Sequence, residues 1–442
     1  MKIGLIAMSG VRACDAELLQ LGLTLPGFVE RSKTIASLPS LGLLTLAGLT
    51  PAEHECEYLE VEDIRKLDDL PDGLDLAAIS SFSAQMGEGY ELADRYRARG
   101  VPVVLGGLHA TALPDEAAEH CDAVVAGEGE AVWRDVVRDA ENGRLQRIYR
   151  GDGQFDLAEA PMPAFHLLDI SKYNRLTVQA SRGCPLRCEF CASSTLLTGR
   201  YKQKPVQRVL AEIDRIRELW RRPFLEFADD NAFVQKPYWK ELLAELAERR
   251  VHWFAETDLS VHEDEELLTL ARKGGCAEVL IGLESPIEAG LAGLELKVDW
   301  KRKRWPLYKE AIRRIQSHGI RVNGCFVLGL DEHTPDIFDH VLDFAMDTEL
   351  YDVQITYLTP FPGSPLYDRL KREGRLLHDG QWQRCTLFDI NYRPRRMSVD
   401  ELRAGFHRLA AQLYSDDLTK WRRETFHRKY LRADSYCPEV LS

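Results

Sequence analysis

Long apolar runs are missing from this 442-residue sequence, and none reaches the roughly 20 residues that a helix needs to cross a bilayer. The apolar stretch at Met1–Ile6 is too short for a secretion signal and has no small-residue cleavage site, so we expect a first strand there. These absences predict a cytoplasmic protein without a membrane partner.

An excess of positive charge is also missing. The sequence has 57 Lys and Arg against 70 Asp and Glu, which gives a formal net charge of −13. Binding to nucleic acid usually requires a basic face, so we expect a small-molecule substrate and no nucleic acid. The basic run from Lys301 to Arg304 is interpreted as the solvated start of a helix.

Cysteines at metal-ligand spacing are missing outside one motif. Seven of the ten cysteines are scattered along the chain, and a reducing compartment disfavours disulfides between them. We expect most of these seven to be buried free thiols. They are Cys14, Cys56, Cys121, Cys276, Cys325, Cys385 and Cys437.

The other three cysteines lie in the motif Cys184-Pro185-Leu186-Arg187-Cys188-Glu189-Phe190-Cys191. In a tight loop, these spacings would bring three thiols to one point, at three corners of an iron–sulfur cube. Such a cluster normally has four cysteine ligands, so a site with three leaves one iron open to a ligand that is not protein. The alternatives are three structural cysteines or a zinc site that is short of one ligand.

The stretch Ser181–Cys191 resembles the CxxxCxxC loop of the radical S-adenosylmethionine (SAM) enzymes. The resemblance implies a [4Fe-4S] cluster on Cys184, Cys188 and Cys191, whose open iron chelates SAM and cleaves it reductively to a 5′-deoxyadenosyl radical. It also implies an electron donor such as flavodoxin or ferredoxin. In that family, an aromatic residue at the position of Phe190 lies near the adenine.

Residues 1–145 alternate short apolar strands with amphipathic stretches, which predicts a doubly wound, Rossmann-like parallel sheet. Ligands bind such sheets at the carboxyl ends of the strands, here in the loops Ser80–Ser83, Gly106–His109 and Gly127–Glu130. The expected strands are Lys2–Met8, Glu55–Val61, Leu76–Phe82, Val101–Leu105 and Ala123–Ala126, with helices at Gly87–Arg99 and Asp115–His120.

Together with Leu38–Leu44, these loops resemble the cobalamin-binding-type domain that precedes many radical SAM cores. The loop after the first strand lacks Asp-x-His-x-x-Gly, whose imidazole is the lower cobalt ligand in many cobalamin proteins. His109 follows a different strand, and we interpret it as a loop residue rather than a ligand. Cobalamin stays open as a third cofactor, because family members without that His either bind it or keep only the fold.

A connector is expected at 146–175, where Gly151–Gly153 and Pro161–Pro163 interrupt any periodicity. Six β/α repeats follow in 176–363, and the resemblance implies that they form a six-stranded partial (β/α)6 TIM barrel. The expected strands are Thr177–Ala180, Phe224–Phe227, Trp253–Glu256, Val279–Leu283, Val322–Leu328 and Val353–Leu358.

The last part, 364–442, is predicted to be a mostly helical segment that covers the active site. A helix is expected from Val399 to Tyr414, with Ser398 as its cap. The aromatic and basic residues of this segment either line a substrate pocket or fix the segment on the barrel. They are Trp382, Phe388, Tyr392, Arg393, Arg395 and Arg396.

Barrel enzymes place their chemistry at the carboxyl ends of the strands. Asp229 or Asp230 would hold the SAM ammonium group by a charge-assisted hydrogen bond, or would cap the next helix. The resemblance implies further cofactor-binding residues, with a ribose and carboxylate site at the fourth strand end and an adenine-flanking stretch in the fifth. These residues are Gly282, Glu284, Ser285 and Phe326.

Glu256 and Asp258 end the third strand, and Tyr357 ends the sixth, within a stretch Thr356–Leu366 that is common in the cobalamin-type branch. Their positions make all three candidates for catalytic acid or base, and Glu256 also a candidate for cofactor binding. For Tyr357, packing in the barrel is an equal alternative.

Two outcomes for the substrate radical remain open. In the first, methylcobalamin held by the N-terminal domain supplies a methyl group to an unactivated carbon. In the second, the radical reaction needs no cobalamin and dehydrates or deoxygenates a sugar-like diol. A third hypothesis is a corrinoid or iron–sulfur carrier without catalysis.

Overall fold

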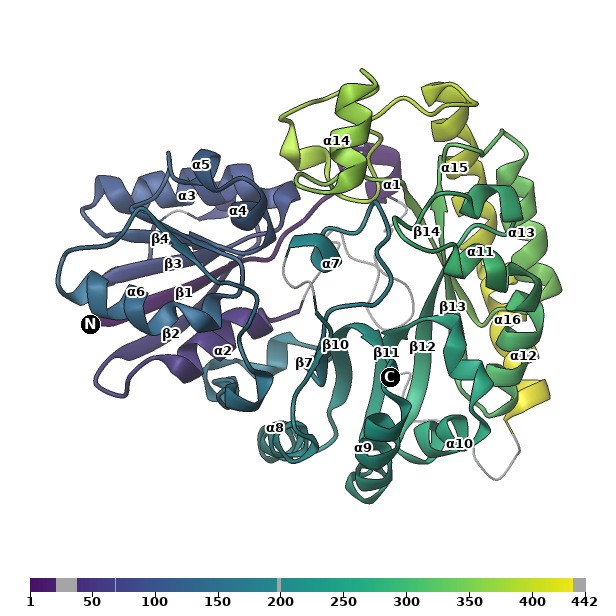
Figure 1. Cartoon of the computed structure of the whole chain (residues 1–442), viewed down its shortest axis with the longest axis horizontal. Helices are drawn as coiled ribbons and strands as arrows, with labels where there is room; N and C mark the ends of the chain where they lie inside the picture. Colours follow the sequence, from purple (N-terminus) through teal and green to yellow (C-terminus); the bar gives the residue numbers. More distant parts are fainter. Residues whose placement is uncertain (21–37, 68, 197–199, 432–442) are drawn as a thin grey trace.

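The computed structural model describes residues 1–20, 38–67, 69–196 and 200–431, which form two parallel sheets and a C-terminal helical segment (Figure 1). None of the described cysteines forms a disulfide. Cys121, Cys276 and Cys385 are buried as expected, whereas Cys56 and Cys325 are half-buried and Cys14 is exposed. Cys437 lies outside the described residues.

The N-terminal sheet has six parallel strands in the order β2-β1-β3-β4-β5-β6. The strands are β1 (Lys2–Met8), β2 (Glu55–Val61), β3 (Leu76–Ser80), β4 (Val103–Gly106), β5 (Ala123–Ala126) and β6 (Ile148–Arg150). Central strands such as β1 are buried along almost their whole length, as expected of a parallel sheet covered on both faces. The doubly wound prediction is confirmed, but β6 begins the stretch that was predicted to be a connector.

Helices cover both faces of this sheet. One face packs against α3 (Met86–Ala98), α4 (Leu108–Ala112) and α5 (Pro114–Ala117), and the other against α2 (Leu41–Leu49) and α6 (Trp133–Glu141). The prediction of a longer helix at 115–120 is wrong, because α5 ends at Ala117.

His109 lies in α4 and is fully buried, so its interpretation as a loop residue is wrong. Its Nδ1 lies 3.0 Å from Ser83 Oγ, and its Nε2 lies 3.2 Å from Glu116 Oε1. Burial lowers the pKa of this imidazole. The side chain is therefore a hydrogen-bonded part of the domain core.

The second sheet also has six parallel strands, in the order β14-β13-β12-β11-β10-β7. They are β7 (Leu176–Val178), β10 (Phe224–Ala232), β11 (His252–Thr257), β12 (Cys276–Glu284), β13 (Arg321–Leu328) and β14 (Asp352–Tyr357). Within the described residues the edge strands β7 and β14 do not pair with each other, so the barrel is partial, as predicted.

Amphipathic helices follow these strands. In α8 the apolar residues recur at helical spacing and are buried against the sheet, while the remaining positions are mostly charged. The helices of the barrel are α8 (Val206–Leu219), α9 (Lys236–Arg249), α10 (Glu265–Lys273), α11 (Trp300–Arg304), α12 (Tyr308–Ser317) and α13 (Ile337–Asp347). Shorter elements beside the cysteine motif are β8 (Ser181–Arg182), α7 (Ser193–Leu196) and β9 (Lys202–Gln203).

The C-terminal segment contains α14 (Pro365–Arg372), α15 (Val399–Leu413) and α16 (Asp416–Tyr430). Ser398 caps α15 in a capping box with Glu401, which confirms the predicted helix start. Figure 1 shows α14 at the top of the view, above the space between the two sheets, and α1 (Ala16–Gln20) is drawn behind it. None of the helices in the described ranges is both long and apolar enough to span a bilayer.

Candidate active site

The cysteine motif is a loop between β8 and α7. Gly183 enters it with φ +92°, and the Cys191 N–H donates to the Cys188 carbonyl at 3.1 Å. The stretch 294–296 runs antiparallel beside the loop, because Cys188 pairs with Glu295 and the Glu189 N–H donates to the Leu294 carbonyl at 2.8 Å. Backbone hydrogen bonds to this stretch therefore fix the loop.

The three thiols of the motif are close enough to interact. Burial raises the pKa of Cys184 to about 11, and the Cys191 thiol adds to the rise in the pKa of both Cys184 and Cys188. Across the described residues, no three His, Cys, Asp or Glu side chains are placed to hold a single metal ion. A cluster of several irons does not require all three thiols at one metal ion, so the roles of Cys184, Cys188 and Cys191 as cluster ligands stay predictions.

Three consecutive residues near the carboxyl end of β10 hold the cysteine loop. Asp229 accepts hydrogen bonds from the backbone N–H of Ala180 (3.1 Å) and from the N–H and hydroxyl of Ser181. Burial raises the pKa of Asp229 to about 7, and the Ser181 bonds oppose this rise. Asp229 therefore fixes the end of the strand that precedes the motif.

Asp230 and Asn231 continue this support. Asp230 accepts the Gly183 N–H at 2.6 Å and the Ser193 hydroxyl, which joins the two ends of the loop. Asn231 Nδ2 lies 3.6 Å from Cys184 Sγ and donates to Asp258 at 2.8 Å. A hydrogen bond to a sulfur of an iron–sulfur cluster tunes the reduction potential of the cluster. The sequence singled out the two aspartates but gave no signal for Asn231.

Glu226, Glu256 and Glu284 come from the neighbouring strands β10, β11 and β12. Arg175 pairs with Glu226 at 2.5 Å, and Lys301 pairs with Glu284 at 2.7 Å. Glu256 has no ion-pair partner among the described residues. It is accessible to solvent, but the surrounding protein limits its hydration and raises its pKa to about 7, with Glu226, Asp230 and Glu284 adding to the rise.

Glu256 can therefore bind a cation or exchange a proton near neutral pH, and its ionisation should cost stability. The pKa of Glu256 in the folded protein lies above the ordinary value of 4.5. The stability that the protonated carboxyl group contributes below pH 4.5 is therefore lost as the pH rises to about 7. We expect Glu256→Gln to become increasingly more stable than the wild type across this range, as measured by thermal unfolding. The exposed Glu91→Gln is the control, and a difference independent of pH would contradict the assignment.

Lys301 is a site residue that the sequence analysis placed wrongly. It is buried, and its Nζ donates to Glu284 (2.7 Å) and to the Gly282 carbonyl (2.6 Å). Burial raises the pKa of Cys188, and the charge of Lys301 opposes this rise. A side chain at Gly282 would begin 2.5 Å from Glu284 Oε1, so this glycine leaves room for the ion pair.

Ser285 follows Glu284, which has φ +62°. The Ser285 hydroxyl is fully buried and lies 3.0 Å from His333 Nε2. Burial lowers the pKa of His333 to about 3, so this imidazole is neutral. His333 was not predicted, since a lone histidine in a loop gives no signal in the sequence.

The remaining predicted site residues are Asp258, Phe190, Phe326 and Tyr357. Asp258 caps a 3-10 turn through the Ser260 N–H at 2.8 Å, and Phe190 is half-buried beside the core. Phe326 packs against Phe344 of α13, and Tyr357 packs against Phe406 of α15, with ring centroids 5.8 and 4.1 Å apart. The cofactor and catalytic roles of all four stay predictions. The contact of Tyr357 agrees with the alternative that this side chain packs in the barrel.

In the C-terminal segment, the contact of Tyr392 agrees with the alternative that these residues fix the segment on the barrel, whereas Trp382 contacts the N-terminal domain. Trp382 Nε1 donates to Glu116 of the N-terminal domain at 2.9 Å, and the Tyr392 hydroxyl donates to the Gly329 carbonyl at 2.6 Å.

A cavity of about 340 Å³ connects the two sheets. Its N-terminal wall is formed by α2 and the strand ends of β3, β4 and β5, and its barrel wall includes Arg182, Ser193 and Asp230. Arg182 also pairs with Glu128 (2.9 Å) and Glu130 (2.6 Å) across the interface. The loops predicted to bind a cofactor therefore face the base of the cysteine loop.

A Rossmann-like domain that faces a six-stranded partial barrel, with a three-cysteine loop after the first barrel strand, defines a radical SAM enzyme with an N-terminal B12-binding domain. The Radical SAM superfamily matches residues 178–345, and the B12 binding domain family matches residues 34–137. Residues 364–436 match a domain of unknown function, DUF4070.

Known proteins are similar to this chain over most of its length. An uncharacterized methyltransferase of Synechocystis sp. is 31% identical over 374 residues, which is 82% of this chain and 68% of that protein. Bacteriochlorophyllide d C-12(1)-methyltransferase of Chlorobaculum tepidum is 28% identical over 85% of this chain and 82% of its own. The structure of TsrM from Kitasatospora setae with cobalamin and a [4Fe-4S] cluster has a TM-score of 0.68 at 16% identity, covering 94% of this chain and 89% of that chain.

The chain thus belongs to the radical SAM superfamily, in the branch that carries an N-terminal B12-binding domain. It is an enzyme, and a [4Fe-4S] cluster and SAM are its cofactors. The hypothesis of a carrier without catalysis is overturned by this membership.

Proposed function

We propose that the protein is a cobalamin-dependent radical SAM methyltransferase that transfers a methyl group to an unactivated carbon of a small molecule. The observation that carries the proposal is the cavity between the two sheets, which connects the B12-binding loops with the base of the cysteine loop. A cofactor held in this cavity would face the site at which the substrate radical forms.

The wall of the cavity would let a cofactor lie against the backbone. Gly107 and Gly127, with φ +98° and +86°, are two of the glycines at the strand ends that line it. Without side chains there, a ligand can approach the peptide groups closely. The cavity lining in the described residues includes no His, Cys or Met, in agreement with the missing lower-ligand motif. We infer that none of these lining residues would supply an imidazole or sulfur ligand to cobalt.

In this proposal, one set of residues binds the cluster and SAM, and the cavity between the two sheets binds the corrinoid. Cys184, Cys188 and Cys191 hold the cluster, and the carboxylates of Asp230 and Glu256 are the candidates for the SAM ammonium group. When bound, SAM with the cluster supplies the 5′-deoxyadenosyl radical, and the corrinoid supplies the methyl group. An electron donor such as flavodoxin or ferredoxin is part of the proposal.

Relatives support methyl transfer without defining the substrate. Besides the bacteriochlorophyllide enzyme, hopanoid C-2 methylase of Rhodopseudomonas palustris is 29% identical over 78% of this chain and 66% of its own. Both names describe methylation of carbon. At these identities the substrate of this chain is not carried over.

A cavity-filling variant tests the cobalamin site. Gly129 lines the cavity, and a Cβ there would have only ordinary contacts at 3.6 Å, so Gly129→Phe should fold and place its ring in the cavity. After anaerobic reconstitution with hydroxocobalamin and desalting, we expect retained cobalt to fall about tenfold or more while retained iron is unchanged. Gly87→Phe, at an exposed position in α3 with open space around it, is the control. Wild-type cobalt retention by Gly129→Phe would contradict the proposal.

Radical dehydration of a sugar-like diol is the second candidate, and Glu256 favours it. An unpaired carboxyl group with a pKa of about 7 is suited to act as acid or base near neutral pH. Incubation with deuteriomethyl-SAM distinguishes the two functions. A product that carries the label supports methylation, whereas formation of 5′-deoxyadenosine with an unlabelled, dehydrated product supports the second candidate.

A further inference from the structure

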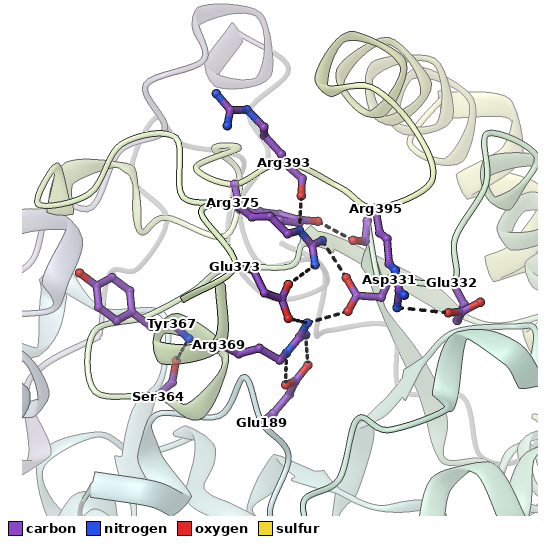
Figure 2. A network of polar contacts seen from close by, with 12 residues as sticks. Glu189, Asp331, Glu332, Ser364, Tyr367, Arg369, Glu373, Arg375, Arg393 and Arg395 are labelled. Atoms are coloured by element: carbon purple, nitrogen blue, oxygen red, sulfur yellow. Dashed lines mark hydrogen bonds and ion pairs between the residues drawn. The ribbon is translucent and has the colours of Figure 1, made fainter. Parts of the chain in front are cut away.

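The cysteine loop is held from the C-terminal segment through Glu189, which lies between two predicted cluster ligands in the motif. Arg369 of α14 binds the Glu189 carboxylate with two hydrogen bonds, of 2.9 Å from Nε and 2.6 Å from Nη2 (Figure 2). The Leu366 N–H donates to the Glu189 carbonyl at 2.9 Å. Side chain and backbone of the same loop residue are therefore both bound by α14.

Arg369 is itself fixed by carboxylates from other elements. Its Nη1 donates to Asp331, in the loop after β13, at 2.7 Å, and Arg375 donates to the second oxygen of Asp331, also at 2.7 Å (Figure 2). Arg375 further binds Glu373 at 2.8 Å. Bidentate guanidinium–carboxylate pairs combine strength with fixed geometry, and a network preorganises the central side chain.

The turn before α14 belongs to the stretch Thr356–Leu366 that the sequence analysis singled out without a function. Ser364 caps α14 by accepting the Tyr367 N–H at 3.2 Å. Gly363 has φ +75°, and a Cβ there would lie 3.0 Å from Ala112 of α4 and 3.0 Å from Leu196 of α7. The helix thus starts where the N-terminal domain, the helix after the cysteine loop and the barrel come together.

We propose that α14 is a clamp that holds the cysteine loop in its cluster-binding conformation, and that Arg369 is its positioning residue. This gives a role to the first helix of the segment that matches a domain of unknown function. Arg369 acts through Glu189 on Cys188 and Cys191 and contacts neither SAM nor substrate in this role. The inference rests on membership in the radical SAM superfamily and does not require cobalamin.

Thiol reactivity in the cluster-free protein tests the clamp. We expect Arg369→Gln to increase the alkylation rate of Cys188 and Cys191 by iodoacetamide about tenfold, since a charge-assisted hydrogen bond has that effect on a local opening equilibrium. Arg372→Gln, an exposed position on the same helix, is the matched control and should match the wild type. Arg369→Lys keeps the positive charge but cannot form the bidentate pair with Glu189. Its alkylation rate should therefore lie between those of Arg369→Gln and the wild type.

A second readout follows the reconstituted cluster by electron paramagnetic resonance after reduction. Arg369→Gln should broaden the signal and lower iron retention, and Arg372→Gln should not. If Arg369→Gln does not fold, Glu189→Gln replaces it, because this change weakens the same contact and leaves Arg369 paired with Asp331. Wild-type alkylation rates together with a wild-type signal, in whichever of the two variants folds, would overturn the proposal. Cobalt retention does not enter either readout.

Discussion

Replacement of Cys184, Cys188 or Cys191 by Ala should reduce the formation of 5′-deoxyadenosine from SAM to that of a protein-free control. The motif is predicted to provide three protein ligands, and the loss of one should leave too few to retain the cluster. The measurement is an anaerobic incubation with SAM and a chemical reductant, with 5′-deoxyadenosine quantified by chromatography.

Cys14→Ala is the control for these three variants, because Cys14 is an exposed free thiol outside the motif. It should form 5′-deoxyadenosine at the wild-type rate. A variant of any motif cysteine that reached that rate would show that the assigned residue is not a cluster ligand.

Lys301→Ala should lower the free energy of unfolding by about 3 to 5 kcal/mol, because removing one partner of a buried ion pair leaves the other charge uncompensated. Both side chains of the pair with Glu284 are only 8% exposed, and the Nζ–Oε1 distance is 2.7 Å. Urea unfolding followed by tryptophan fluorescence gives the difference. Lys303→Ala, at an exposed position in the same helix, should stay within about 0.5 kcal/mol of the wild type.

The double variant Lys301→Ala/Glu284→Gln separates charge from packing. If the orphaned carboxylate causes the loss, neutralising it should recover part of the stability. A double variant that is less stable than Lys301→Ala would contradict this explanation. The pair would then stabilise the barrel by its packing, and the link between Lys301 and the cysteine loop would be weakened.

The sequence predicted the fold well, because parallel sheets leave a strong apolar pattern. Strands such as β1 and β13 are buried along most of their length, and the amphipathic helices between them show a clear period. The strand β6, with only three residues, is too short for such a pattern. The cysteine motif was equally clear, because its spacing reflects one continuous loop.

The surroundings of the motif were less predictable, because distant segments provide them. The clamp on Glu189 comes from Arg369, 180 residues further along the chain. Lys301 lies in a run of four basic residues, of which a helix turns only one inward, and composition does not tell which. The predictions for Asp229 and Asp230 found the right strand end, but both carboxylates hold the cysteine loop itself.

Cobalt retention tests the central claim most directly. The chain would be reconstituted anaerobically with iron, sulfide and hydroxocobalamin, desalted, and analysed for iron and cobalt together with its absorption spectrum. The account predicts an intact cluster and near-stoichiometric cobalt, held in the cavity between the two sheets. An intact cluster with no retained cobalt would contradict it, and the search for products would then turn to radical dehydration.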